Sequence, residues 1–181
     1  VVLDKTGTLT QGQPQVTDVL PLTGWTSDQL LALAAAAEVN SEHPLGQAIV
    51  AGARERELAL PEVTDFQSLT GFGIQVRVDQ VTYYLGNRRL MQEQGLDLDQ
   101  ADDQAAALAA GGKTPIYVAN EHELLGLIAV ADPLKATSPE AVRRLKAMGL
   151  QVIMLTGDNA KTAQALAAEA GIDQVISDVL P

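Results

Sequence analysis

Hydrophobic positions change their spacing along the chain, and the two ends share one pattern. There, short apolar runs such as Val1–Leu3 and Val152–Leu155 alternate with longer amphipathic segments that end at a glycine. Short apolar runs bounded by turn residues are typical of buried strands, and the longer segments, 138–148 and 159–170, predict helices. Because strands alternate with helices, both ends are predicted to build a parallel, doubly wound α/β sheet.

The middle of the chain has a different pattern, in which helical segments come first and short extended runs follow. The first helix is expected at 30–39 behind the capping stretch 26–28, and Pro44 suits the first turn of a second helix at 44–58. The pair at 79–80 is a hairpin turn signal. The other elements expected here are the strands 16–22, 64–69, 74–78, 81–85, 115–119 and 124–130 and the helices 88–94 and 100–110.

These patterns predict two domains. Residues 1–13 and 128–181 are expected to form one discontinuous, Rossmann-like α/β domain. Residues 14–127 are expected to form an inserted α+β domain, an antiparallel sheet flanked by helices.

Composition narrows the classes of function. Hydrophobic residues make up 46% of the chain but aromatic residues only 3%, which predicts a core of aliphatic side chains. The formal net charge of −11 argues against a nucleic-acid partner. Cysteine is absent, which excludes disulfides, and His43 and His122 are too far apart in sequence to suggest a zinc cluster. No apolar run is long enough to span a bilayer, so we expect a soluble chain.

The stretch 4–10, Asp-Lys-Thr-Gly-Thr-Leu-Thr, follows directly on the first apolar run. It places Asp4 at the carboxyl end of a buried strand, the edge where open α/β sheets bind ligands. A carboxylate there can act as a nucleophile that accepts a phosphoryl group, beside the positive charge of Lys5 and the hydroxyl of Thr6. A lone Asp would indicate an ordinary turn, but the whole heptapeptide resembles the phosphorylation signature of P-type ATPases.

A second strand end carries Thr156, Gly157 and Asp158. Thr156 could donate a hydrogen bond to a transferred phosphoryl group, whereas Asp158 could also cap the following helix. Together with Asp4, this pattern resembles the haloacid dehalogenase superfamily. Most phosphatases of that superfamily have a second Asp where this chain has Thr6, so the resemblance implies slow hydrolysis of an aspartyl-phosphate.

A third motif, Ser-Glu-His-Pro-Leu at 41–45, lies between the two helices of the middle stretch. It resembles the motif of the nucleotide-binding domain in heavy-metal (type IB) P-type ATPases. The resemblance implies that His43 orients ATP and that Glu38 accepts from the adenine amino group. Without the flanking match, His43 would be expected simply to close a turn before a helix that starts at Pro44.

Gly71 and Gly73, at a turn between two expected strands, resemble the Gly-x-Gly nucleotide loop of the same family. Glycine there would let the backbone approach the ligand closely. Asn87 resembles the family's polar contact to the nucleotide. An isolated Gly-x-Gly could also be an ordinary turn or bulge.

The resemblance implies an ATP-binding domain with an incomplete phosphorylation domain from a heavy-metal pump, with copper(I) as the expected cargo. ATP and Mg²⁺ are the implied cofactors, with Asp4 and Thr6 on the metal, and the implied partners are the actuator and transmembrane domains. The chain would be a cytoplasmic piece of an integral membrane protein that binds ATP with little turnover. Two alternatives remain, a soluble phosphohydrolase with an inserted cap and a non-catalytic nucleotide-binding regulator.

Overall fold

A computed structural model describes residues 1–22, 24–158, 160–177 and 179, and its contacts divide the chain into two compact units. The terminal unit comprises Val1–Pro14, Ala107–Thr114 and Ala131–Pro181, and the middle unit comprises Gln15–Ala106 and Pro115–Val130. This grouping differs from the ranges predicted above mainly at residues 107–114. Each unit is described by itself below.

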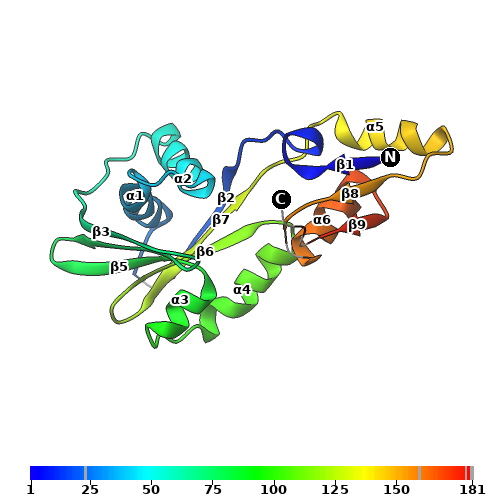
Figure 1. The fold of residues 1–181 in the computed structure, drawn as a ribbon. Coiled ribbons are helices and arrows are strands. Elements are labelled where there is room, and N and C mark those ends of the chain that lie inside the picture. Colours follow the sequence, from blue (N-terminus) through cyan, green and yellow to red (C-terminus); the bar gives the residue numbers. More distant parts are fainter. Residues whose placement is uncertain (23, 159, 178, 180–181) are drawn as a thin grey trace. The chain divides into compact units, whose positions relative to one another are not determined.

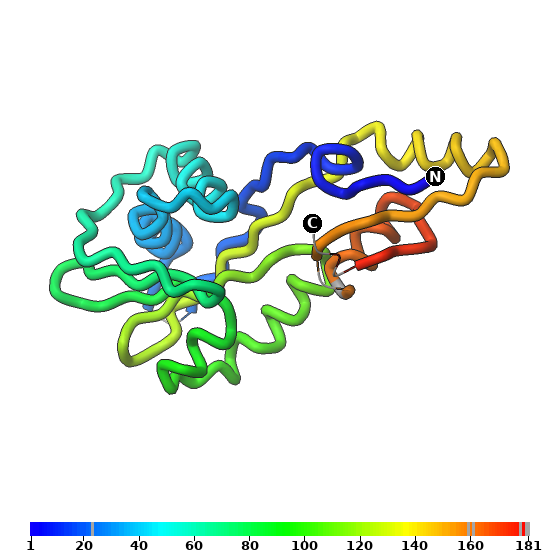
Figure 2. Tube along the Cα trace, viewed as in Figure 1, coloured from blue at the N-terminus to red at the C-terminus, as the bar shows by residue number. Residues whose placement is uncertain are grey.

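The terminal unit is built on a parallel sheet in the order β1-β8-β9. Its strands are β1 (Val2–Asp4), β8 (Ile153–Leu155) and β9 (Gln174–Ile176), and both neighbouring pairs are parallel, as the alternating pattern predicts. The tube in Figure 2 shows the blue strand β1 beside the orange strand β8, although about 150 residues separate them in the sequence. Parallel pairing places the carboxyl ends of β1 and β8 at one edge.

Two helices complete the core of the terminal unit. These are α5 (Ser138–Ala147) and α6 (Ala160–Ala170), which contact each other. Leu9, from a wide turn η1 (Lys5–Leu9) directly after β1, is buried with Val142 of α5 and Met154 of β8. The catalytic candidates of this unit therefore lie on segments that the hydrophobic core fixes.

The middle unit contains a six-stranded sheet in the order β2-β7-β6-β5-β4-β3. Adjacent strands from β3 to β6 pair antiparallel, as the hairpin pattern predicts. The strands are β2 (Gln15–Pro21), β3 (Thr64–Leu69), β4 (Gly73–Val78), β5 (Val81–Gly86), β6 (Thr114–Asn120) and β7 (Leu124–Ala131). Between β4 and β5, Asp79 and Gln80 both have positive φ, the conformation of a tight two-residue hairpin turn.

Four helices flank this sheet, with α1 and α2 on one side and α3 and α4 on the other (Figure 1). Their bounds are α1 (Ser27–Glu38), α2 (Pro44–Glu55), α3 (Arg88–Glu93) and α4 (Asp99–Ala110). Residues 124–130 of β7 are buried without alternation, as expected of a strand covered on both faces. One aliphatic core joins α1 and α2 to the sheet, and it contains Leu30, Ile49, Ile74 and Val76.

The start of α1 shows how local sequence fixes a helix end. Thr26 accepts a hydrogen bond from Gln29 N, while the Gln29 side chain accepts one from Thr26 N, which forms a capping box.

Within the described ranges, no helix has the length and hydropathy that crossing a bilayer requires.

Candidate functional site

Asp4 ends β1 beside the end of β8, with which it is paired through Leu155. Thr156, Gly157 and Asp158 follow β8 at once, so the sheet brings the two predicted strand-end motifs to one edge. Asp4 is exposed, whereas Thr156 is only 5% exposed. An exposed carboxylate beside a buried hydroxyl leaves Asp4 open to an incoming ligand.

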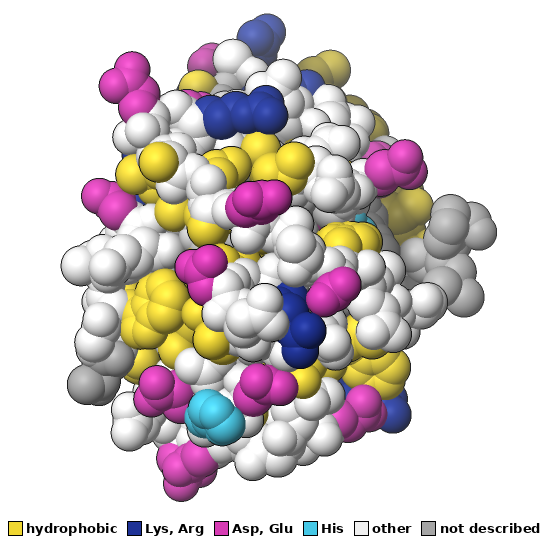
Figure 3. All heavy atoms as spheres, turned by 90° about the vertical axis from the view of Figure 1, so that its left-hand side faces the viewer, with side chains coloured by type: hydrophobic (Ala, Val, Ile, Leu, Met, Phe, Trp, Pro, Cys, Tyr) yellow, Lys and Arg dark blue, Asp and Glu magenta, His cyan; other side chains and the backbone are white. Residues whose placement is uncertain are grey.

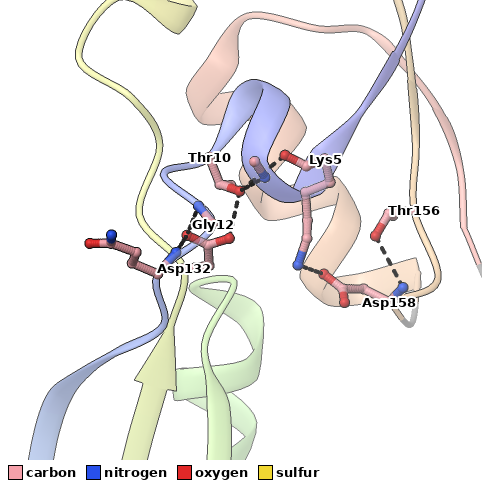
Figure 4. Close-up of polar contacts among 8 residues, drawn as sticks. Lys5, Thr10, Gly12, Asp132, Thr156 and Asp158 are labelled. Atoms are coloured by element: carbon pink, nitrogen blue, oxygen red, sulfur yellow. Dashed lines mark hydrogen bonds and ion pairs between the residues drawn. The ribbon is translucent and has the colours of Figure 1, made fainter. Parts of the chain in front are cut away.

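Lys5 and Asp158 join the two motifs directly. Lys5 Nζ lies 2.7 Å from Asp158 Oδ2, and the Asp158 backbone N–H donates to Thr156 Oγ1 at 3.1 Å (Figure 4). The Lys5 side chain is 16% exposed, so this ion pair is better shielded from solvent than a surface pair. The Asp158 carboxylate therefore holds Lys5, a role that the sequence did not indicate.

The turn η1 is held by a network centred on Thr10, which is fully buried. Thr10 N donates to Lys5 O at 3.0 Å, and the Thr10 hydroxyl donates to Asp132 Oδ2 at 2.6 Å. The other Asp132 oxygen accepts from the backbone N–H groups of Gly12 and Gln13 (Figure 4). Asp132 thus fixes the path of the chain just after the nucleophile motif.

Lys135 supports the same turn. Its ammonium donates to Gly7 O at 2.5 Å, and its backbone N–H donates to Leu9 O. Gly7 has a φ of +74°, which a side chain would make strained. Lys135 therefore stabilises the turn that carries Thr6 and Gly7.

Glu38 and His43 lie in the middle unit, around the connection between α1 and α2. His43 is the N-cap of α2, where its Nδ1 accepts from Leu45 N at 3.2 Å. In the neutral ring the proton must then be on Nε2, which remains available as a donor. The structure thus shows the capping role of His43, which uses one ring nitrogen and leaves the other.

Glu38 is the last residue of α1, and its Oε2 is buried with no hydrogen-bond partner in the described part of the chain. Burial raises the pKa of the Glu38 carboxyl, although a hydrogen bond from the Ser41 side chain and the charge at His43 act in the opposite direction. Buried acceptors without a partner are rare in proteins. Glu38 is therefore a candidate for binding a ligand donor.

Gly71, Gly73 and Asn87 form a second part of the candidate site. Gly71 has a φ of +79°, and its carbonyl accepts from Asn87 Nδ2 at 2.8 Å. Asn87 Oδ1 also accepts from Leu90 N and so caps α3. A Cβ atom at Gly73 would lie 2.0 Å from Leu85 O, so strand packing already requires glycine there.

Leu45 and Ile74 tie these two parts of the middle unit to one hydrophobic core. Leu45 is the last residue of its motif, and Ile74 follows Gly73 directly. Next to the glycine turn, the Arg89 guanidinium lies 4.8 Å from the centre of the Phe72 ring. Arg88 instead makes a bidentate ion pair with Asp102.

The described residues contain no cluster of three or more His, Cys, Asp or Glu side chains that could hold a metal ion. Asp4 and Thr6 are both exposed and supply oxygen donors, the type that Mg²⁺ prefers, and phosphate oxygens commonly complete such sites. The two residues fit Mg²⁺ only together with a phosphorylated ligand.

Two residues that bear on the site were missed by sequence reasoning, Thr10 and Gly46. Thr10 belongs to the nucleophile heptapeptide, so its place in the motif was a usable signal. Gly46 is a glycine inside an expected helix, where glycine is unfavourable, and this was the signal for a packing requirement.

The chain belongs to the haloacid dehalogenase-like hydrolase family, whose model matches residues 1–180. Among curated proteins, it is 46% identical over 181 residues to the copper-exporting P-type ATPase of Bacillus subtilis (strain 168). That match covers 100% of this chain and 23% of the relative.

Comparison with solved structures also points to ATPases. A zinc-transporting PIB-type ATPase in its E2.Pi state superposes with a TM-score of 0.86 at 37% identity, covering 99% of this chain and 29% of that one. The catalytic domain of the CPx-ATPase CopB-B, studied for its conformational changes upon nucleotide binding, gives a TM-score of 0.68 at 25% identity, with 98% and 61% covered.

These similarities confirm the predicted fold class and the predicted resemblance to heavy-metal P-type ATPases. They also favour an ATPase over a soluble phosphohydrolase with an inserted cap. The chain spans less than a quarter of the length of the curated relatives with which it was compared, about 22% to 24%.

Proposed function

We propose that this chain is the ATP-binding and phosphorylation region of a P-type ATPase that transports a heavy-metal cation, with copper(I) as the expected cargo. ATP would bind the middle unit, and its γ-phosphate would be transferred to Asp4 of the terminal unit. The observation that carries the proposal is the sheet edge at which exposed Asp4 meets Lys5, Thr156 and Asp158. Similarity to copper-exporting and zinc-transporting ATPases along the whole chain supports it.

The chemistry follows from the positions of these groups. An Asp4 carboxylate oxygen would attack the γ-phosphorus as the bond from that phosphorus to the ADP oxygen breaks, which leaves an aspartyl-phosphate and ADP. Lys5 would offset negative charge on the phosphoryl oxygens, held in place by Asp158. The Thr156 hydroxyl oxygen accepts from Asp158 N, so its proton remains free to be donated to a phosphoryl oxygen.

Mg²⁺ would be held by Asp4, Thr6 and the phosphate oxygens, where it would supply positive charge. Thr6 has no titratable group that could act as a general base for hydrolysis of the aspartyl-phosphate. The intermediate would therefore persist long enough for a conformational change. This property suits a pump better than a phosphohydrolase.

In the middle unit, His43 would donate from Nε2 to the nucleotide, and Glu38 would accept from the adenine amino group. Gly71, Gly73 and Asn87 would border the bound nucleotide. The transported cation, the actuator domain and the membrane segments would belong to the rest of the same polypeptide. Since ATP is a cytoplasmic substrate, the region would face the cytoplasm.

ATP titration of this chain by calorimetry, beside His43→Gln, tests the nucleotide half of the proposal. We expect saturable binding that the substitution weakens by about 1–3 kcal/mol, since a hydrogen bond to a charged group would be lost. Folding of both proteins would be checked by circular dichroism. Absence of binding by the folded wild-type chain would contradict the proposal.

Asp4 is tested in the full-length parent. Incubation with γ-labelled ATP should leave acid-stable, hydroxylamine-sensitive label on the protein, as expected of an acyl phosphate. Asp4→Asn should abolish it while ATP binding persists. Label that survives this substitution would remove Asp4 as the nucleophile.

A further inference from the structure

Gly46 lies in the first turn of α2 and is buried. Its φ is not positive, so an L-residue could adopt the same backbone conformation. Glycine in a helix is less favourable than alanine. The backbone of α2 therefore gives no reason for glycine at this position, and the reason must lie in what surrounds it.

The space that a side chain would occupy is taken by the Glu38 carboxylate. A Cβ atom at Gly46 would lie 2.3 Å from Glu38 Oε2 and 2.9 Å from Glu38 Cδ. It would also lie 3.0 Å from Ser41 Oγ, which accepts a hydrogen bond from His43 N. Real Cβ atoms do not approach other heavy atoms as closely as 2.3 Å, so any larger residue would displace this carboxylate.

The same oxygen, Oε2, is the buried acceptor that has no partner among the described residues. Two individually unfavourable features, a helical glycine and an unpaired acceptor, thus face each other at one point. Glu38 as a whole is only partly buried, so its carboxylate lies at the boundary between the two helices and solvent. This arrangement fixes a carboxylate in a defined position and leaves its Oε2 without a partner among the described residues.

We propose that Gly46 is a positioning residue for nucleotide recognition. Because Gly46 has no side chain, the Glu38 carboxylate can occupy the position from which it selects a purine with an amino group at carbon 6. The inference rests on the proposed function, because it needs ATP to bind at Glu38 and His43. An amino group at carbon 6 donates to a carboxylate, whereas the oxygen at the same position of hypoxanthine does not. Gly46 would thereby determine preference for ATP over inosine triphosphate.

Gly46→Ala tests this inference in the 181-residue chain, with ATP and inosine triphosphate titrated separately. We expect ATP affinity to fall about tenfold, the size of one lost hydrogen bond, while inosine triphosphate binding changes little. The ratio of the two affinities should therefore approach one. Gly52→Ala is the matched control, since it adds a methyl group to the same helix next to Val16 and should leave the ratio unchanged.

A double-mutant cycle with Glu38→Ala separates positioning from a general structural effect. If Gly46 acts through Glu38, then Gly46→Ala should not change ATP affinity further once Glu38 is Ala. The double variant loses the clash with Glu38, keeps only the 3.0 Å approach to Ser41 Oγ and gains helix propensity, so it should fold even if Gly46→Ala alone did not. Unfolding midpoints of all four proteins would be compared.

Wild-type affinity for ATP retained by Gly46→Ala would overturn the inference. An equal loss of ATP affinity with and without the Glu38 carboxylate would also overturn it, because the effect would then not pass through Glu38. Failure of the folded wild-type chain to bind ATP would overturn the proposed function and this inference with it. The three outcomes are distinguishable in one set of titrations.

Discussion

Gly71 and Gly73 stand two residues apart and both have positive φ, but only Gly73 is also crowded by a neighbouring strand. Gly71 needs its positive φ, and no atom lies within 4 Å of the position a Cβ would take. Gly73 also has a positive φ, +149°, and in addition it faces Leu85 O and Gly86 Cα of the neighbouring strand, at 2.0 and 2.6 Å from such a Cβ. The motif that resembled a ligand loop is thus also a close contact between strands.

The two alanine substitutions should therefore differ in stability. Gly71→Ala should lower the free energy of unfolding by about 1–2 kcal/mol, the cost of a left-handed residue with a side chain. Gly73→Ala should lower it by about 3 kcal/mol or more, because β4 and β5 would have to separate. Urea unfolding followed by circular dichroism measures both. Equal losses would contradict the additional steric role of Gly73.

Sequence reasoning at the scale of single residues worked where a residue's role depends on its neighbours along the chain. Thr26 caps α1, and Asp79-Gln80 forms the hairpin turn, as their local patterns predicted. It did not predict that Asp158 would pair with Lys5, because 153 positions separate these residues. The roles of Gly73 and Gly46 likewise depend on atoms from other segments.

At the scale of elements, one side chain both caps α3 and attaches it to the glycine turn, while Leu90 and Met91 of the helix are buried. Asn87 Oδ1 caps the helix through Leu90 N, and Asn87 Nδ2 binds Gly71 O. The helix has only six residues, so it could not persist without such support. Asn87 therefore couples the glycine turn to the helix that follows β5.

Two substitutions separate these two bonds. Asn87→Ala should destabilise the chain by about 1–2 kcal/mol, since the cap and the bond to Gly71 are both lost. Asn87→Asp should cost less, because aspartate is as good a cap as asparagine but cannot donate to Gly71 O. Unfolding in urea gives the two values, with Gln92→Ala on the exposed part of α3 as a control expected within about 0.5 kcal/mol of wild type. A larger loss for Asp than for Ala would contradict this account.

The predicted elements agree closely with the observed ones because each was bounded by a strong local signal. β3 was predicted at 64–69 and is observed at Thr64–Leu69, while α5 was predicted at 138–148 and is observed at Ser138–Ala147. The sequence did not indicate which strands would be neighbours in the sheet. The order β2-β7-β6-β5-β4-β3 places β2 beside β7, a pairing of segments about 100 residues apart that no local pattern encodes.

At the scale of the whole molecule, charge is the dominant feature. The chain carries 23 acidic and 12 basic residues. Figure 3 shows Asp and Glu side chains spread over the face in view, with fewer Lys and Arg side chains among them. The ion pairs are mostly exposed, as in Arg56–Asp28, and pairs of this kind contribute little. Net repulsion should therefore outweigh local attraction.

Salt should stabilise this chain. Raising NaCl from about 0.01 to 0.2 M should increase the free energy of unfolding by about 1 kcal/mol, because screening weakens the repulsion among carboxylates. Neutralising two exposed carboxylates, through Asp103→Asn and Glu169→Gln, should reduce this dependence. Thermal unfolding at a series of NaCl concentrations measures it. Destabilisation by salt would instead mean that the ion pairs dominate.

The sequence by itself determined the elements, the parallel and antiparallel character of the two sheets and the motifs that carry chemistry. These properties depend on hydrophobic period, capping residues and turn residues, which act within about ten positions of the chain. Only the tertiary structure decided which groups meet: Lys5 with Asp158, Thr10 with Asp132, and Gly46 with the Glu38 carboxylate. Such contacts depend on the packing of segments that are distant in sequence or belong to different helices, and on steric limits of a few tenths of an ångström that no local pattern records.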